Sequence, residues 1–169
     1  LTQEGMNAIR DDFAVLESAI RGGDFEQVQK LLDVQTFIDF LIIQELVYNV
    51  ELEAPRSMYI HKDVNGLWTM GPLWDFDAGF DFDWSTMYTG HNYFKSYRKL
   101  VMGTNPATHQ GAYCNPPRFF TDLFKVEAFK QQYKERWKEV FPLTEAAFEE
   151  VLLYIDDEAM QRNQDRWPI

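Results

Sequence analysis

The chain has 169 residues, enough for one domain with a sizeable core, and its 46% hydrophobic and 16% aromatic content excludes a disordered chain. Its net charge of −11 argues against a nucleic-acid partner, because phosphate binding requires clustered Lys and Arg. The one cysteine, Cys114, excludes an internal disulfide framework and a zinc site built from several cysteines.

No apolar run approaches the ~20 residues that span a bilayer, so we expect no membrane span in this chain. The sequence opens at Leu1 without an initiator Met and enters a helical pattern at once. We therefore expect a piece of a longer protein, whose targeting signals this chain would not reveal.

Three helices are predicted in the first 49 residues. Apolar residues recur at spacings of three and four over residues 3–22, and Gly22-Gly23 ends that pattern. Asp24 is a candidate cap for a short helix through Leu32, and Asp33 for a third helix. The third helix is apolar on most sides, so it should be central and buried; Glu45, inside it, then needs an Arg or backbone donors as partner.

A small β-hairpin follows. Residues 57–62 (SMYIHK) and 67–70 (LWTM) read as strands, and Asn65-Gly66 between them is a strong turn signal because both residues tolerate positive φ. Residues 81–117 show little periodicity, with a short helix possible around residues 91–103.

Helices return after Pro116-Pro117. The run PRFFTDLFK leads into EAFKQQYKERWKEVF, whose aromatic residues from Phe129 to Phe141 fall on one face. Pro142 should break this helix, and Thr144 should cap a last one that runs to about Arg166. The predicted fold is therefore α+β and mostly helical, one domain over residues 1–169 with a hairpin at its middle.

The stretch GPLWDFDAGF at residues 71–80 carries the first candidate site. In an extended chain, alternation would place Asp75 and Asp77 on one face, about 7 Å apart, where they could share a divalent cation. Carboxylate oxygens suit Mg²⁺, Mn²⁺ or Ca²⁺ better than zinc. The alternative interpretation is that these acids face water at a strand end or cap the next turn.

Asn49 and Glu51 form the second candidate site, at the end of the buried helix and just before the hairpin. A hairpin returns the chain to its start, so Glu51 and Asp75 could flank one cleft. A carboxylate that accepts a proton, with others that hold a metal, is the minimum set for phosphoryl transfer or metal-assisted hydrolysis. The alternative is a helix cap at Asn49 and a solvated Glu51. His61, Ser57 and Cys114 are weaker candidates, since none has a partner at a telling spacing.

The sequence resembles the CotH kinase family, named for spore coat protein H. The similarity covers roughly residues 34–167 and is carried by FIDFLIIQELVYNVELEAPRSMYIHKDVNGLWTMGPLWDFDAGF, and by PPRFFTDLFKVEAFKQQYKERWKEV and NQDRWP further on. The family motifs are a helix with "NEL…N-x-D/E", a strand "S-x-Y-x-Y-K-D" and "GP-[VIL]-WD-[FY]-[DN]".

The resemblance implies an atypical protein-kinase-like fold that uses ATP and Mg²⁺ or Mn²⁺ to phosphorylate Ser on surface or coat proteins, at a bacterial cell surface or outside the cell. It places the catalytic base at Glu51, where many members have Asp, with Asn49 beside it. It places the metal and its nucleotide at Asp75, with Asp77 as second ligand. Ser57 stands where some members have a metal-holding Asn.

Only the C-terminal lobe of such a kinase is recognisable, because nothing here resembles the β-rich lobe that holds the nucleotide. We therefore expect this chain alone to bind ATP weakly and to be inactive. Two other functions stay open at this point. One is a catalytically silent adhesion or scaffold module of the cell surface. The other is a carbohydrate-binding module, for which exposed Trp84 and Tyr88 would argue.

Overall fold

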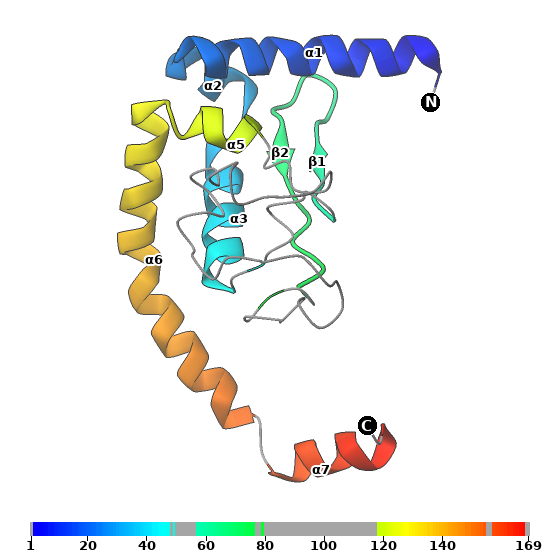
Figure 1. The fold of residues 1–169 in the computed structure, drawn as a ribbon, viewed down its shortest axis with the longest axis vertical. Helices are drawn as coiled ribbons and strands as arrows, with labels where there is room; N and C mark the ends of the chain where they lie inside the picture. The colour runs from blue at the N-terminus through cyan, green and yellow to red at the C-terminus, as the bar shows by residue number, and fades with distance from the viewer. Residues whose placement is uncertain are drawn as a thin grey trace, which may run out of the picture. The chain divides into compact units, whose positions relative to one another are not determined.

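A computed structural model describes residues 2–47, 49, 57–76, 79, 118–154 and 157–167. The described part is mostly helical with one small antiparallel sheet, which confirms the α+β prediction (Figure 1). The chain divides into two compact units, Leu1–Tyr133 and Lys134–Ile169. The predicted short helix at residues 91–103 lies outside the described residues.

The first unit begins with the three predicted helices, α1 (Gln3–Gly22), α2 (Phe25–Leu31) and α3 (Val34–Leu46). Gly23 ends α1 in the left-handed conformation, with φ of 70°. Asp24 and Asp33 cap α2 and α3, each accepting a hydrogen bond from a backbone N–H three residues on, as predicted. Local cap chemistry therefore fixes where these helices start.

Only the second half of α1 enters the core. Leu16 and Ile20 are buried where α1 packs on α2 and on α5 (Arg118–Leu123), whereas Met6 and Ile9 are about half exposed. In contrast α3 is buried on most sides, as its sequence predicts, and Phe37 and Leu41 are almost fully covered. The core of this unit thus lies between α3 and the helices around it.

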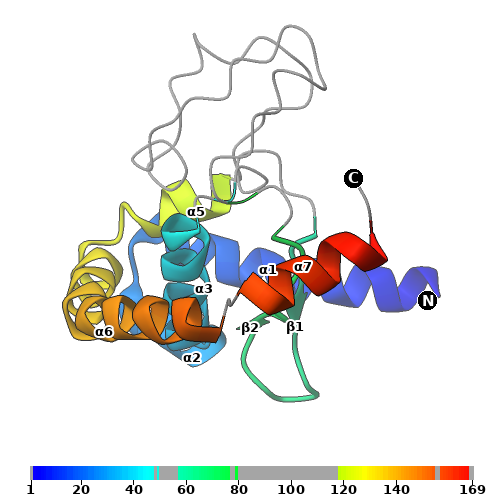
Figure 2. The same ribbon diagram turned by 90° about the horizontal axis from the view of Figure 1, so that it is seen from below.

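The hairpin consists of β1 (Ile60–His61) and β2 (Thr69–Met70), shorter than the predicted strands. Ile60 pairs with Met70 and His61 with Thr69. Asn65 has φ of 62°, and the Gly66 N–H donates to the Asp63 carbonyl, which makes the predicted turn. The turn extends past the helices of this unit (Figure 2).

The second strand is tied to the beginning of α3. The Asp33 N–H donates to the Trp68 carbonyl, the Trp68 N–H to the Leu31 carbonyl, and the Met70 N–H to the Thr36 hydroxyl. These bonds use the edge of β2 that faces away from β1. The hairpin is therefore held at a fixed place on α3.

Two predictions for the last part of the chain are wrong. Helix α6 (Glu127–Tyr154) begins in the first unit, enters the second at Lys134 and continues past Pro142, and Thr144 does not cap a new helix. Proline removes one N–H donor, but its φ is itself helical, so the chain does not have to leave the helix there. The Thr144 hydroxyl donates to the Phe141 carbonyl within the helix, and a separate α7 (Asp157–Arg166) follows.

Candidate functional site

Two of the four predicted site residues, Asn49 and Asp75, lie in the described part of the chain. Glu51 and Asp77 lie outside it, so their roles, and the predicted cleft between Glu51 and Asp75, stay predictions. The proposed sugar platform of Trp84 and Tyr88 also lies outside the described residues.

Asn49 is placed by the way α3 ends. Its backbone N–H donates to the Gln44 carbonyl at 2.9 Å. Asn49 is the third residue after Leu46, the last residue of α3, and Gln44 is the third residue from that end of the helix. This is the longer of the two bonds of a Schellman helix end. Asn49 is only 3% exposed, so its side chain contacts protein atoms rather than water.

Asp75 is the point where three separate segments meet. The Asn49 side-chain amide donates to the Asp75 carbonyl at 3.4 Å, and the Ser57 hydroxyl donates to Asp75 Oδ2 at 2.7 Å. These contacts join the end of α3, the segment before β1 and the segment after β2. The hairpin thus brings together two residues that are 18 positions apart.

The backbone at this point is strained. Asp75 has φ of 65° and Ser57 has φ of 54°, both in the left-handed region. Such a conformation in a residue other than glycine costs of order 1–3 kcal/mol, and it persists only where the surroundings enforce it, most often at functional sites. The expected extended alternation of Asp75 and Asp77 is therefore wrong at Asp75, because the chain turns there.

The segment after Asp75 lies against the end of α3. A Cβ added at Gly79 would stand 3.0 Å from the Phe76 carbonyl oxygen and 3.1 Å from the Val47 carbonyl oxygen. The Gly79 N–H also donates to the Phe76 carbonyl. A side chain here would force one of the two backbone segments to shift by a few tenths of an ångström, so glycine suits this close approach.

Glu45, in the last turn of α3, accepts a hydrogen bond from the Tyr133 hydroxyl of α6. The sequence predicts a buried carboxylate with an Arg or backbone partner. The structure shows a half-buried carboxylate, one of whose partners is a tyrosine 88 residues away. Nothing local in the sequence singles out Tyr133, since it belongs to an apolar helix face.

The chemistry of these residues suits a hard cation. The Ser57 bond uses Oδ2 of Asp75, so Ser57 does not occupy Oδ1. Carboxylate oxygens are the preferred protein ligands of Mg²⁺ and Mn²⁺. Within the described residues no three His, Cys, Asp or Glu side chains cluster, so a complete set of protein ligands would need further residues such as Asp77.

Described residues of the first unit also line two hollows. One, of about 540 Å³, is lined by Tyr59, Pro72 and Trp74 among others, and both aromatic side chains are half exposed. Sequence patterns missed it, although Trp74 directly precedes Asp75. His61, one of the weaker candidates, is exposed and lines the same hollow.

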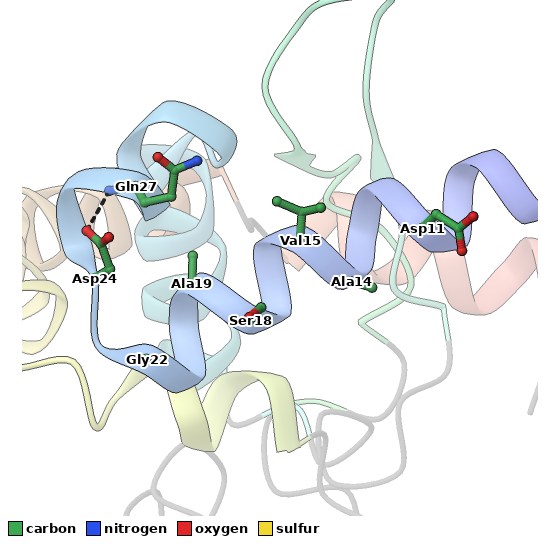
Figure 3. A pocket seen from close by; sticks show the side chains of 8 residues that line it. All are labelled: Asp11, Ala14, Val15, Ser18, Ala19, Gly22, Asp24 and Gln27. Carbon is green, nitrogen blue, oxygen red and sulfur yellow. Dashed lines mark hydrogen bonds between the residues drawn. The ribbon is translucent and has the colours of Figure 1, made fainter.

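The other hollow, of about 680 Å³, lies along α1 and α2 (Figure 3). Its acidic groups are Asp11 and Asp24, and the Asp24 carboxylate is already used to cap α2 through the Gln27 N–H at 3.0 Å. The remaining lining is mostly small residues. This hollow offers no set of groups that points to a ligand.

A family model matches this chain over almost its whole length. The family model described as CotH kinase protein matches residues 2–168. Searches of curated proteins and of solved structures found no match. In the described part of the chain, no helix has the length and apolar content needed to cross a membrane. Because the family model covers almost all of the sequence, the chain belongs to the CotH kinase family and is a kinase-like protein.

Proposed function

We propose that this chain supplies the metal-holding and proton-accepting half of a kinase site, which transfers phosphate from ATP to Ser of a protein substrate. Membership of the CotH kinase family supports this reaction class. The spore-coat association of that family supports surface or coat proteins as substrates, and a location at or outside the bacterial cell surface.

The observation that carries the proposal is the strained turn at Asp75. A left-handed aspartate is held at its carbonyl by Asn49 and at its carboxylate by Ser57. A surface acid needs neither bond. A carboxylate that must present one oxygen to a ligand benefits from both, because preorganisation lowers the cost of binding.

Each residue has a distinct role in the proposal. Asp75 and Asp77 hold Mg²⁺ or Mn²⁺, Glu51 accepts the proton of the substrate hydroxyl, and Asn49 holds the turn beside the base. The metal, when bound, neutralises charge on the ATP phosphates. The residues that contact the nucleotide would belong to the β-rich lobe of such kinases, and no part of this sequence resembles that lobe. The chain alone should therefore bind ATP weakly.

Titration calorimetry with Mn²⁺ tests the proposal. The wild-type chain should bind Mn²⁺, and Asp75→Ala should lower the affinity at least about tenfold, since it removes a direct ligand. Asp11→Ala, which removes an exposed aspartate of α1, should leave the affinity unchanged and serves as the matched control.

Two results would contradict it. Equal Mn²⁺ affinity in Asp75→Ala and the wild type would remove Asp75 from the metal site. No Mn²⁺ binding by the wild type would favour the catalytically silent adhesion or scaffold module instead.

A carbohydrate-binding module is a second candidate, favoured by the half-exposed Tyr59 and Trp74 around one hollow. Sugar rings stack on such faces, and protein sites for them are rich in aromatic residues. A panel of oligosaccharides should then change the tryptophan fluorescence of the wild type but not of Trp74→Ala. The same response in both proteins, or none in either, would exclude this site.

A further inference from the structure

The last turn of α3 carries an acid where a helix disfavours one. The carbonyl end of a helix has a partial negative charge, so a carboxylate there is repelled, and more strongly where water is partly excluded. Glu45 lies in this turn and is half-buried. A donor that offsets this cost is the Tyr133 hydroxyl, which bonds to Glu45 Oε2.

The Tyr133 hydroxyl is held in place by packing. The ring is 7% exposed and meets Phe124 edge-on, with ring centroids 5.0 Å apart. Phe124 in turn meets the fully buried Phe129 at 5.3 Å. Edge-to-face pairs of this kind fix ring orientation, so the Tyr133 hydroxyl is held in a fixed position beside Glu45.

The same turn of α3 leads directly to the candidate site. The Gln44 carbonyl, one residue before Glu45, accepts the Asn49 N–H at 2.9 Å. The Asn49 side chain then reaches the Asp75 carbonyl at 3.4 Å, a distance at which a small shift would break the bond. The position of Asn49 therefore depends on how firmly the last turn of α3 is held.

From this chain of contacts we propose that Tyr133 is a positioning residue: through Glu45 it holds the end of α3, and so keeps Asn49 against Asp75. The inference rests on the proposed metal-holding role of Asp75. Tyr133 touches neither substrate nor metal in this proposal. It acts only on the geometry of the turn.

Two readouts on the full chain test this. The first is the side-chain amide signal of Asn49 in a ¹H–¹⁵N NMR spectrum, which reports its hydrogen bond. The second is Mn²⁺ affinity by calorimetry. Tyr133→Phe keeps the packed ring and removes the hydroxyl, so it should shift the Asn49 amide signal and weaken Mn²⁺ binding about threefold or more.

Two further variants separate positioning from general destabilisation. Glu45→Gln keeps an oxygen that accepts from Tyr133, so it should retain the Asn49 signal and the Mn²⁺ affinity, whereas Glu45→Ala should reproduce the effect of Tyr133→Phe. Thr144→Val removes a hydroxyl from the same helix that donates to Phe141, and it should change neither readout.

The outcomes distinguish the two proposals. If the wild type binds no Mn²⁺ through Asp75, the proposed function fails, while the Asn49 signal still decides whether Tyr133 fixes the turn. If Mn²⁺ binds through Asp75 but Tyr133→Phe leaves either readout unchanged, the positioning role of Tyr133 is overturned. An equal loss in Glu45→Gln and Glu45→Ala would also overturn it, because charge rather than the hydrogen bond would then matter.

Discussion

The Ser57 hydroxyl donates to the Asp75 carboxylate at 2.7 Å, and both residues hold a left-handed backbone. A hydrogen bond thus joins two strained residues, one before β1 and one after β2. Each strained conformation is maintained by a contact with the other. Loss of this hydrogen bond should therefore disturb both residues together, which leads to the first two predictions.

Replacing Ser57 should separate the hydrogen bond from the strain. Ser57→Ala loses the bond and keeps the unfavourable φ, so it should lower the free energy of unfolding by about 1–3 kcal/mol. Ser57→Gly loses the same bond but accepts positive φ without strain, so it should be more stable than Ser57→Ala by about 1 kcal/mol. Urea denaturation measures both. Equal stability of the two variants would show that the backbone at this position is not strained.

Asp75→Asn should separate metal binding from stability. Asparagine tolerates the left-handed region and offers an oxygen to Ser57, so the free energy of unfolding should change by less than about 0.5 kcal/mol. The loss of charge should nevertheless abolish most Mn²⁺ binding in calorimetry. A strongly destabilised Asp75→Asn would mean that the negative charge itself holds the turn.

Gly79→Ala should destabilise the chain by about 1–3 kcal/mol, because its new Cβ would lie within 3.0 and 3.1 Å of two backbone oxygens and would displace one of the segments that carry them. Gly22→Ala is the matched control. It has open space around the new Cβ and lies at the end of α1, so it should be neutral or stabilising by up to about 1 kcal/mol. Thermal unfolding of both variants checks the contrast.

Pro142→Ala should stabilise α6. The substitution restores an N–H donor in the helix interior and removes the ring clash with the preceding turn, which is worth up to about 3 kcal/mol. Circular dichroism should show equal or greater helicity and a higher unfolding temperature. Lys138→Ala, at an exposed position of the same helix, controls for gain of helix propensity alone. A drop in helicity in Pro142→Ala would show that proline is required for the shape of this segment.

The parts of the fold that the sequence predicts are those decided by neighbouring residues. Asp24 and Asp33 cap helices because each carboxylate accepts a hydrogen bond from a backbone N–H only three residues further along the chain. Gly23 ends α1 and Asn65 turns the hairpin because each adopts positive φ easily. These predictions needed no knowledge of the rest of the chain.

The parts that it does not predict depend on distant contacts. The turn at Asp75 is enforced by Ser57 and Asn49, 18 and 26 positions away, against the extended conformation that local alternation suggests. One partner of Glu45, Tyr133, comes from α6, 88 positions away. Likewise the rule that proline ends a helix is a tendency, and α6 continues past Pro142.

Because β2 is attached to α3, the length of the helix sets how far the chain after β2 must extend to reach the candidate site. Met70 is bound to Thr36 near the beginning of α3, and Asp75 is bound to Asn49 just beyond its end. The ten residue steps from Thr36 to Leu46 rise about 15 Å along the helix, and the five steps from Met70 to Asp75 span at most about 17 Å. The segment from Met70 to Asp75 must therefore span a length that the helix sets. Deleting one residue between Gly71 and Trp74 would draw Asp75 back by about 3 Å and out of reach of Asn49. Relatives of this chain should accordingly vary in the residues of this stretch far more readily than in its length.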